Sequence, residues 1–307
     1  MRGTLEHAKL YRLCRSGRWL PGFVRVAAVV VLMVAVAAAG GCQVDPVTGR
    51  TELNTLTRAE GIAVGQQHAP EYVKAFGGEV DDLAIRQYVT ELGGRIAAVS
   101  HEPDLPWRFY VVDSSVVNAF AIPGGHVFVT RGLLTLFEDE AELMSVLGHE
   151  VAHVVRGHSG QQQARAEMVQ LGLIIGGAAS GAQGEDLQRI YNIGGQVSTL
   201  VFLLPFSREH ENQADETGLA YMVKAGYEPR AMADMLDKLA RQSDGKGRPL
   251  LLFSTHPYPQ QRAKTIRQLI AKRYSGPDVP HELARDRYRR EVLDRLAKLA
   301  PPRHQAQ

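Results

Sequence analysis

The residues with the clearest chemical potential are Gly148-His149-Glu150-Val151-Ala152-His153, which lie inside a stretch with helical periodicity. Successive residues of an α-helix are rotated by about 100°, so residues four apart lie only about 40° from each other around the axis. His149, Glu150 and His153 therefore point toward a common site. Two neutral imidazoles at this spacing suit tetrahedral Zn²⁺. Zinc lowers the pKa of its bound water to about 7, and Glu150 is placed to take a proton from that water.

A catalytic zinc site needs a third protein ligand and one open coordination position. His158 is the nearest candidate, but on one continuous helix a residue nine positions after His149 faces the opposite side. We therefore interpret His158 as an ordinary helix-end residue. The run also departs from H-E-x-x-H-x-x-G-x-x-H, because Arg156 and Ser159 stand at the glycine and third-histidine positions.

The better candidate for a third ligand is Glu211, in Ser207-Arg-Glu-His-Glu-Asn-Gln-Ala-Asp215. Glu211 and Asp215 are four residues apart and share one face of a predicted helix. One carboxylate could bind the metal while the other holds an imidazole ligand in the required tautomer. Taken alone, these two residues would more often be solvated charges on a helix surface.

A mainly helical domain must position these motifs. Residues 107–113 alternate and are β-rich, and residues 119–122 and 126–130 are two more short strand candidates. Together they predict a small sheet, with a hairpin around Pro123-Gly124-Gly125. Helical periodicity and end signals predict one further helix before residue 273 and helices over residues 57–76, 80–99, 131–136, 140–158, 207–225 and 229–241. The predicted fold class is α+β, mostly helical, with a small β-sheet.

Residues 168–206 have two interpretations. Two apolar halves, 171–180 and 197–206, flank a polar break, and neither reaches the roughly 20 residues needed to cross a bilayer. They are either helices packed over the core, or a mobile lid or membrane-contacting flap.

The first 41 residues are typical of a secretion signal, because six basic residues and one acidic residue accompany an apolar run at residues 26–39. Ala39-Gly40-Gly41-Cys42 resembles the bacterial lipoprotein signal box, although leucine is commoner where Ala39 stands. We expect cleavage after residue 41 and lipid on Cys42; the alternative is an uncut N-terminal membrane anchor. Residues 42–56 are polar, with Pro46 and Gly49, and are predicted to be a tether.

Composition narrows the class of function. Without residues 1–41 the formal charge changes from +2 to 29 basic minus 32 acidic residues, or −3, and no basic run remains. Nucleic-acid binding is therefore not expected. Cys14 leaves with the signal, so the mature chain has no internal disulfide. Residues 57–273 are predicted to form the domain, and residues 274–307 a charged helical extension with a loose tail.

Several sequence motifs, in their order along the chain, resemble those of the zinc metallopeptidase family that includes the CAAX prenyl proteases and HtpX. The resemblance is strongest to its periplasmic lipoprotein members such as BepA and LoiP. The resemblance covers about residues 45–273. It rests on the motif from His149 to His153, Ser207-Arg-x-x-Glu-x-x-Ala-Asp215, the Asn118–Gly125 segment, and Ser254-Thr-His256-Pro257 with Arg262.

The resemblance implies a zincin-like fold and a gluzincin site, with one zinc ion on His149, His153 and Glu211, Glu150 as general base and Asp215 supporting a ligand. His256 would lie beside the metal, either as a transient fourth ligand that silences the enzyme or as a donor to the oxyanion. An extended substrate would add to an edge strand that includes Asn118, Ala119, Phe120 and Gly124. For His256 the plain alternative is a loop histidine before a proline. For the Asn118–Gly125 segment it is a core strand with a tight turn.

We therefore predict a zinc-dependent metalloendopeptidase (EC 3.4.24.-) that cleaves misfolded or misassembled envelope proteins bound in extended form. Gln43 after Cys42 favours an outer-membrane lipoprotein on the periplasmic side of a Gram-negative envelope. The alternative is a lipoprotein chaperone or assembly factor for outer-membrane proteins, with a structural or gated zinc site. The tetratricopeptide repeats of BepA-like members and the membrane spans of HtpX have no counterpart here, and the oligomeric state stays open.

Overall fold

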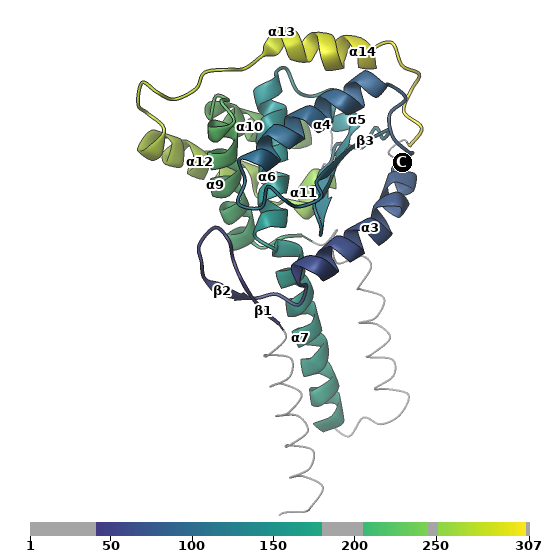
Figure 1. Cartoon of the computed structure of the whole chain (residues 1–307), viewed down its shortest axis with the longest axis vertical. Coiled ribbons are helices and arrows are strands. Elements are labelled where there is room, and N and C mark those ends of the chain that lie inside the picture. Colours follow the sequence, from purple (N-terminus) through teal and green to yellow (C-terminus); the bar gives the residue numbers. More distant parts are fainter. Residues whose placement is uncertain (1–40, 180–204, 245–250, 305–307) are drawn as a thin grey trace, which may run out of the picture. The chain divides into compact units, whose positions relative to one another are not determined.

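The computed structural model describes residues 41–179, 205–244 and 251–304 (Figure 1). Contacts divide the chain into two compact units, Met1–Cys42 and Gln43–Gln307. The second carries the elements discussed below, apart from Cys42 at the start of the first strand. The predicted signal and the central part of the ambiguous 168–206 region lie outside the described residues. Among the residues that are described, no helix is both long enough and apolar enough to span a bilayer.

The main sheet contains β3 (Arg108–Val112), β4 (Ala119–Ile122) and β5 (His126–Thr130), in the order β3-β5-β4. β5 pairs parallel to β3 and antiparallel to β4. The predicted hairpin is therefore present, with β4 at an edge of this sheet. Its turn uses Gly124 at φ 83° and Gly125 at φ 92°, a backbone region that glycine enters without a Cβ clash.

Strand alternation divides the core between the two faces of the sheet. On one face, β-strand residues such as Val111, Ala121 and Val129 join the main core with α4 (Leu83–Ala98) and α6 (Glu140–Val155). On the other face, Phe120 and Phe128 pack against α3 (Arg58–Ala75). Because successive side chains of a strand point to opposite faces, each strand contributes to both parts of the core.

Side-chain caps set where the two site-bearing helices begin. The Asp139 carboxylate accepts a hydrogen bond from the Glu142 N–H at the start of α6. The Ser207 hydroxyl accepts one from the His210 N–H at the start of α9 (Arg208–Lys224). Each cap satisfies an N–H group that has no partner within its helix. Four more helices belong to the domain around the sheet: α5 (Arg131–Leu134), α10 (Arg230–Asp244), α11 (Leu251–Thr255) and α12 (Pro259–Arg273).

The helix predicted over residues 140–158 is interrupted. α6 ends at Val155, Gly157 takes a left-handed φ of 66°, and α7 (His158–Ala179) begins on a new course. Glycine at this position is a common way to end a helix. His158 does lie at a helix end, as the first residue of α7. The prediction that it faces away from the site is wrong, because that prediction assumed one unbroken helix and His158 contacts His153.

The segment predicted to be a tether folds onto the domain instead. β1 (Cys42–Val44) and β2 (Thr51–Leu53) form a two-stranded sheet. The Asp45 carboxylate lies 2.8 Å from an Arg156 guanidinium nitrogen in a buried ion pair, and the Asn54 side chain donates to the Gly157 carbonyl at 3.2 Å. These contacts hold residues 45–54 against the C-terminal end of α6, so Pro46 and Gly49 mark a hairpin and not a flexible run.

The C-terminal segment is also bound. Its helical turns, α13 (Arg285–Tyr288), η2 (Arg289–Leu293) and α14 (Asp294–Leu296), bury Tyr288, Val292 and Leu296 at four-residue intervals in the main core. Beyond them, Arg131 donates to the Ala300 carbonyl at 2.7 Å, and Arg303 donates to Asp113 at 2.9 Å. The predicted loose tail is thus incorrect through residue 304, because its carbonyls and charges have buried partners.

Candidate metal centre

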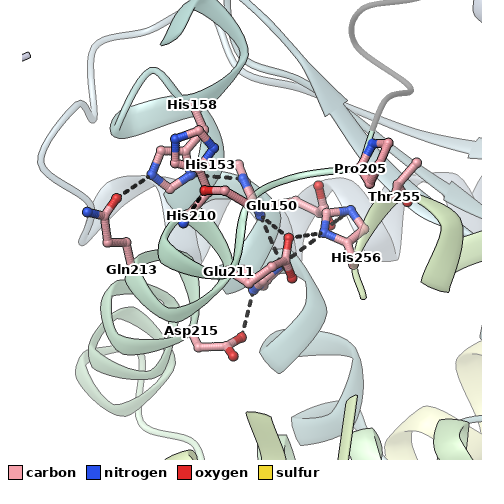
Figure 2. A network of polar contacts seen from close by, with 12 residues as sticks. Glu150, His153, His158, Pro205, His210, Glu211, Gln213, Asp215, Thr255 and His256 are labelled. Atoms are coloured by element: carbon pink, nitrogen blue, oxygen red, sulfur yellow. Dashed lines mark hydrogen bonds and ion pairs between the residues drawn. The ribbon is translucent and has the colours of Figure 1, made fainter. Parts of the chain in front are cut away.

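Three elements bring four donor side chains together (Figure 2). α6 carries His149 and His153, α9 carries Glu211, and His256 lies in the turn between α11 and α12. One ligand atom from each of the four lies within 4.8 Å of all the others, and all four residues are buried. This group could hold a metal ion.

The first predicted ligand, His149, is oriented by Asp215. The His149 Nδ1 lies 2.9 Å from Asp215 Oδ1, so Nδ1 carries the proton and donates it, while Nε2 keeps its lone pair. Burial would raise the pKa of Asp215, but the charge of Arg262 outweighs it and holds that pKa below its ordinary value. Asp215 thus stays an anion, as an orienting carboxylate requires.

Arg262, from α12, ties the carboxylates together. Its Nε donates to Asp215 Oδ2 at 2.8 Å and its Nη2 donates to Oδ1 at 2.7 Å. Its Nη1 lies 2.6 Å from Glu211 Oε2. Burial alone would raise the pKa of Glu211, yet Arg262 and His256 lower it well below the ordinary range. The sequence motif contained Arg262, but nothing in the sequence alone indicated these partners.

The second predicted ligand, His153, is oriented by a chain that sequence reasoning missed. The Gln213 side-chain NH₂ donates to Glu209 at 3.0 Å, which turns its oxygen to accept from His158 Nε2 at 3.0 Å. His158 Nδ1 must then accept from His153 Nδ1, 2.9 Å away. Gly157, which directly precedes His158, was the available signal, because glycine after a helical run indicates a helix end.

The contact of His149 with Asp215 and that of His153 with His158 lead to the same protonation pattern. Burial lowers the pKa of His153 and of His158 well below the ordinary range, so both rings are neutral. With each Nδ1 proton donated outward, the Nε2 lone pairs of His149 and His153 face each other at 3.0 Å. Two lone pairs at that distance repel unless a cation lies between them. The donors therefore fit a cation that prefers nitrogen and carboxylate ligands.

Glu150 and His256 complete the centre. His256 Nδ1 lies 3.0 Å from Glu211 Oε1 and 3.2 Å from His149 Nε2, and its Nε2 lies 3.5 Å from Glu150 Oε1. Burial opposes protonation of His256, but Glu211 and Glu150 outweigh it and raise its pKa. Glu150 Oε2 is buried without a hydrogen-bond partner in the described part of the chain.

The centre is closed in this conformation. Phe206 stacks on His153 with ring centroids 4.1 Å apart, and its N–H donates to the Thr255 carbonyl at 3.0 Å. The Leu252 N–H donates to the Val117 carbonyl at 3.3 Å. α11 and the segment before α9 are thus hydrogen-bonded to each other, and α11 is also hydrogen-bonded to the segment before β4.

The predicted substrate strand lies next to α6, at the edge of the sheet. Asn118 pairs its backbone with Thr130, while its side-chain oxygen and nitrogen are buried without partners among the described residues. Ala119 and Phe120 are buried in β4, and Gly124 is in the hairpin turn. A role for these residues in substrate binding stays a prediction, as does lipid on Cys42, whose free thiol is exposed.

Comparison with known proteins adds independent findings. The model of peptidase family M48 matches residues 84–270. The chain is 34% identical over 183 residues to the mitochondrial metalloendopeptidase OMA1 of Schizosaccharomyces pombe, covering 60% of this chain and 52% of that protein. It is 27% identical over 249 residues to the beta-barrel assembly-enhancing protease of Escherichia coli K12, covering 79% and 50%. The chain spans about half the length of these curated relatives.

Proposed function

The chain belongs to peptidase family M48, and from that membership we propose that it is a zinc-dependent metalloendopeptidase of the cell envelope. One observation carries the proposal. His149, His153 and Glu211 converge with their donor atoms close together. Glu150 lies on the same helix as the two histidines, and one of its carboxylate oxygens is buried without a partner among the described atoms. A hydrolytic site needs this combination of metal ligands and an adjacent base.

Each residue has a distinct role in this proposal. His149, His153 and Glu211 would hold zinc, which when bound supplies Lewis acidity and lowers the pKa of water. Glu150 accepts the water proton at its free Oε2 and returns it to the leaving amine.

The surrounding residues keep those groups in position. Asp215 and His158 hold the Nδ1 protons of the two imidazoles, so the Nε2 lone pairs stay available. Arg262 keeps Glu211 ionised.

We place the substrate among misfolded or misassembled envelope proteins. The name of one relative, beta-barrel assembly-enhancing protease, supports an envelope setting for the proposed substrate. The other relative is named as a mitochondrial protein. The edge strand β4, from Asn118 onward, would pair with an extended peptide through its backbone. Lipid on Cys42 would attach the protein to the outer membrane on the periplasmic side.

A second candidate function is favoured by the position of His256. Its Nδ1 lies within 3.2 Å of both Glu211 and His149, so the centre offers four protein donors and no open position. A four-ligand site is typical of structural zinc. This arrangement suits a chaperone or assembly factor whose zinc site is structural, or an enzyme that His256 keeps gated.

The test uses the full chain purified in detergent. We expect about one zinc per chain, casein hydrolysis that a chelator abolishes, and a Glu150→Gln variant that keeps the metal but loses hydrolysis. Chains without metal, or undiminished cleavage by Glu150→Gln, would contradict the peptidase.

His256→Ala separates the two candidates. A gated peptidase should become faster when its fourth donor is removed. If wild type and His256→Ala are both inert, yet both suppress aggregation of an unfolded client, the chaperone function holds.

A further inference from the structure

A cavity of about 120 Å³ adjoins the candidate metal centre at His153. Its walls are the β1–β2 segment, the start of α3, the β4–β5 turn, and the chain from the end of α6 into α7. Pro123 and Gly124 of that turn belong to the wall, so the cavity also borders the end of the proposed substrate strand. It has room for about four water molecules, or for one long, narrow side chain, without movement of any helix.

Much of this wall comes from a part of the chain that the family match does not include. The match to peptidase family M48 begins at residue 84, whereas the β1–β2 segment and the first turn of α3 lie within residues 43–61. The segment is fixed in place, because Asp45 forms a buried ion pair with Arg156 and Asn54 donates to the Gly157 carbonyl. The cavity is thus a stable feature of this chain.

The wall carries an excess of negative charge. Three carboxylates and two guanidinium groups line it: Asp45, Glu52, Glu102, Arg58 and Arg156. Arg156 pairs with Asp45 at 2.8 Å, and Arg58 pairs with Glu102 at 3.2 Å. Glu52 accepts a hydrogen bond from the neutral Gln161 side chain at 2.5 Å. Glu52 is therefore the lining carboxylate that no cation balances among the described residues.

The end of α6 adds to this negative charge. Val154 and Val155, from its last turn, lie in the wall, and the last carbonyls of a helix carry a partial negative charge. A cation in the cavity would be stabilised by the helix end and by Glu52, whereas an anion would be repelled by both. Apolar side chains such as Val44 and Leu105 complete the wall, and they suit the methylene stem of a long basic side chain.

We propose that this cavity binds a lysine or arginine side chain of the substrate polypeptide that lies along β4. Glu52 pairs with the charge of that side chain, and the apolar part of the wall covers its stem. This inference rests on the proposed peptidase function and adds a preference for substrates with a basic residue, which the β1–β2 segment confers.

Cross-linking tests where the substrate binds. A photoreactive benzoylphenylalanine replaces Val44, which lines the cavity and is 63% exposed, or Leu83, which lies outside it and is 59% exposed. Both full-length chains also carry Glu150→Gln, so that bound casein is not cleaved. We expect casein to cross-link at position 44, through segments enriched in lysine and arginine, and much less at position 83. Equal yields at the two positions, or none at either, would overturn the inference.

A peptide pair tests the charge preference. The casein segment that cross-links is made as two fluorescein-labelled peptides that carry lysine or glutamine at the same position, and binding to the Glu150→Gln chain is measured by fluorescence anisotropy. We expect the lysine peptide to bind about three- to fivefold tighter, as for an ion pair that keeps contact with water. Glu52→Gln keeps an acceptor for Gln161 and should remove that advantage.

Glu71→Gln is the matched control, because Glu71 is an exposed glutamate of α3 outside the cavity. It should leave the lysine advantage unchanged. Equal binding of the two peptides to the chain that retains Glu52, or an advantage that survives Glu52→Gln, would contradict the proposed site.

These binding measurements do not depend on hydrolysis, so the two proposals can fail separately. If the wild type does not cleave casein, the peptidase proposal fails, and the cavity is still judged by the cross-link and the peptide pair. If casein is cleaved but position 44 does not cross-link and the two peptides bind equally, only the basic-residue site fails.

Discussion

Gly148 of α6 and Gly218 of α9 lie against each other where the two helices cross. A Cβ at Gly218 would be 2.7 Å from the Gly148 carbonyl carbon and from the His149 nitrogen, and a Cβ at Gly148 would be 2.8 Å from the Gly218 carbonyl oxygen. Any side chain there would push the helices apart. Gly218 lies two helical turns after Glu211, on the same face, so the close crossing sets how near Glu211 comes to His149.

Gly218→Ala should therefore weaken both the fold and the metal site. We expect overpacking of this kind to reduce the free energy of unfolding by about 1–3 kcal/mol, and separation of the helices to reduce zinc affinity. Urea unfolding and competition with a chelator measure the two effects. Gly94→Ala is the control, because Gly94 is a helical glycine of α4 with open space around its Cβ position. Equal stability and affinity in both variants would contradict the interpretation.

His158→Phe should weaken zinc binding while keeping the ring stacked beside His210, where the His158 centroid lies 4.5 Å away. Phenylalanine cannot accept the proton of His153 Nδ1, so the tautomer and orientation of that ligand are no longer held. Loss of such an orienting partner costs about 10–100-fold in metal affinity. His281→Phe, at an exposed histidine, should bind zinc like the wild type. Unchanged zinc affinity in His158→Phe would show that His153 does not depend on this partner.

Arg262→Met should destabilise the metal-free protein, because it leaves Asp215 and Glu211 buried without their cation. Breaking a buried ion pair from one side costs about 3–5 kcal/mol. Both carboxyl groups have lowered pKa values in the native protein, so their stabilising effect is present at neutral pH and is lost as the pH falls through those lowered values.

The difference in unfolding free energy between wild type and Arg262→Met should accordingly be largest near pH 7 and shrink under strongly acidic conditions. Denaturant titrations across that pH range measure it. Arg267→Met removes an exposed arginine from the same helix and should cost less than about 1 kcal/mol at any pH. A loss for Arg262→Met that is equally small would show that the two carboxylates do not need it.

Asp45→Ala should release the β1–β2 segment from the end of α6, because Arg156 is then buried without its carboxylate. We expect a loss of about 3–5 kcal/mol in unfolding free energy, and faster proteolysis within residues 45–56. The double variant Asp45→Ala, Arg156→Met removes both charges and should recover most of that stability. If Asp45→Ala alone matches the wild type, the ion pair does not hold the segment.

The sequence by itself determined the elements and the local grouping of the site. Helical spacing alone places His149, Glu150 and His153 on one side of a helix, and Glu211 and Asp215 on one face of another. Short β-rich runs bounded by turn residues were enough to predict β3, β4 and β5, because strand-forming residues between turn signals mark a strand locally. These are short-range properties, so a stretch of a few residues is enough to recognise them.

Only the tertiary structure decided which faces meet. The partners of Arg262 and His158 lie 47 and 55 residues away in the chain, and Asn54 binds Gly157 across 103 residues. Periodicity describes one helix at a time, so it could not indicate that α12 supplies a guanidinium to α9, or that α7 begins with the partner of His153. Those contacts depend on how closely the helices pack, and at Gly148 and Gly218 that is set by the absence of two side chains.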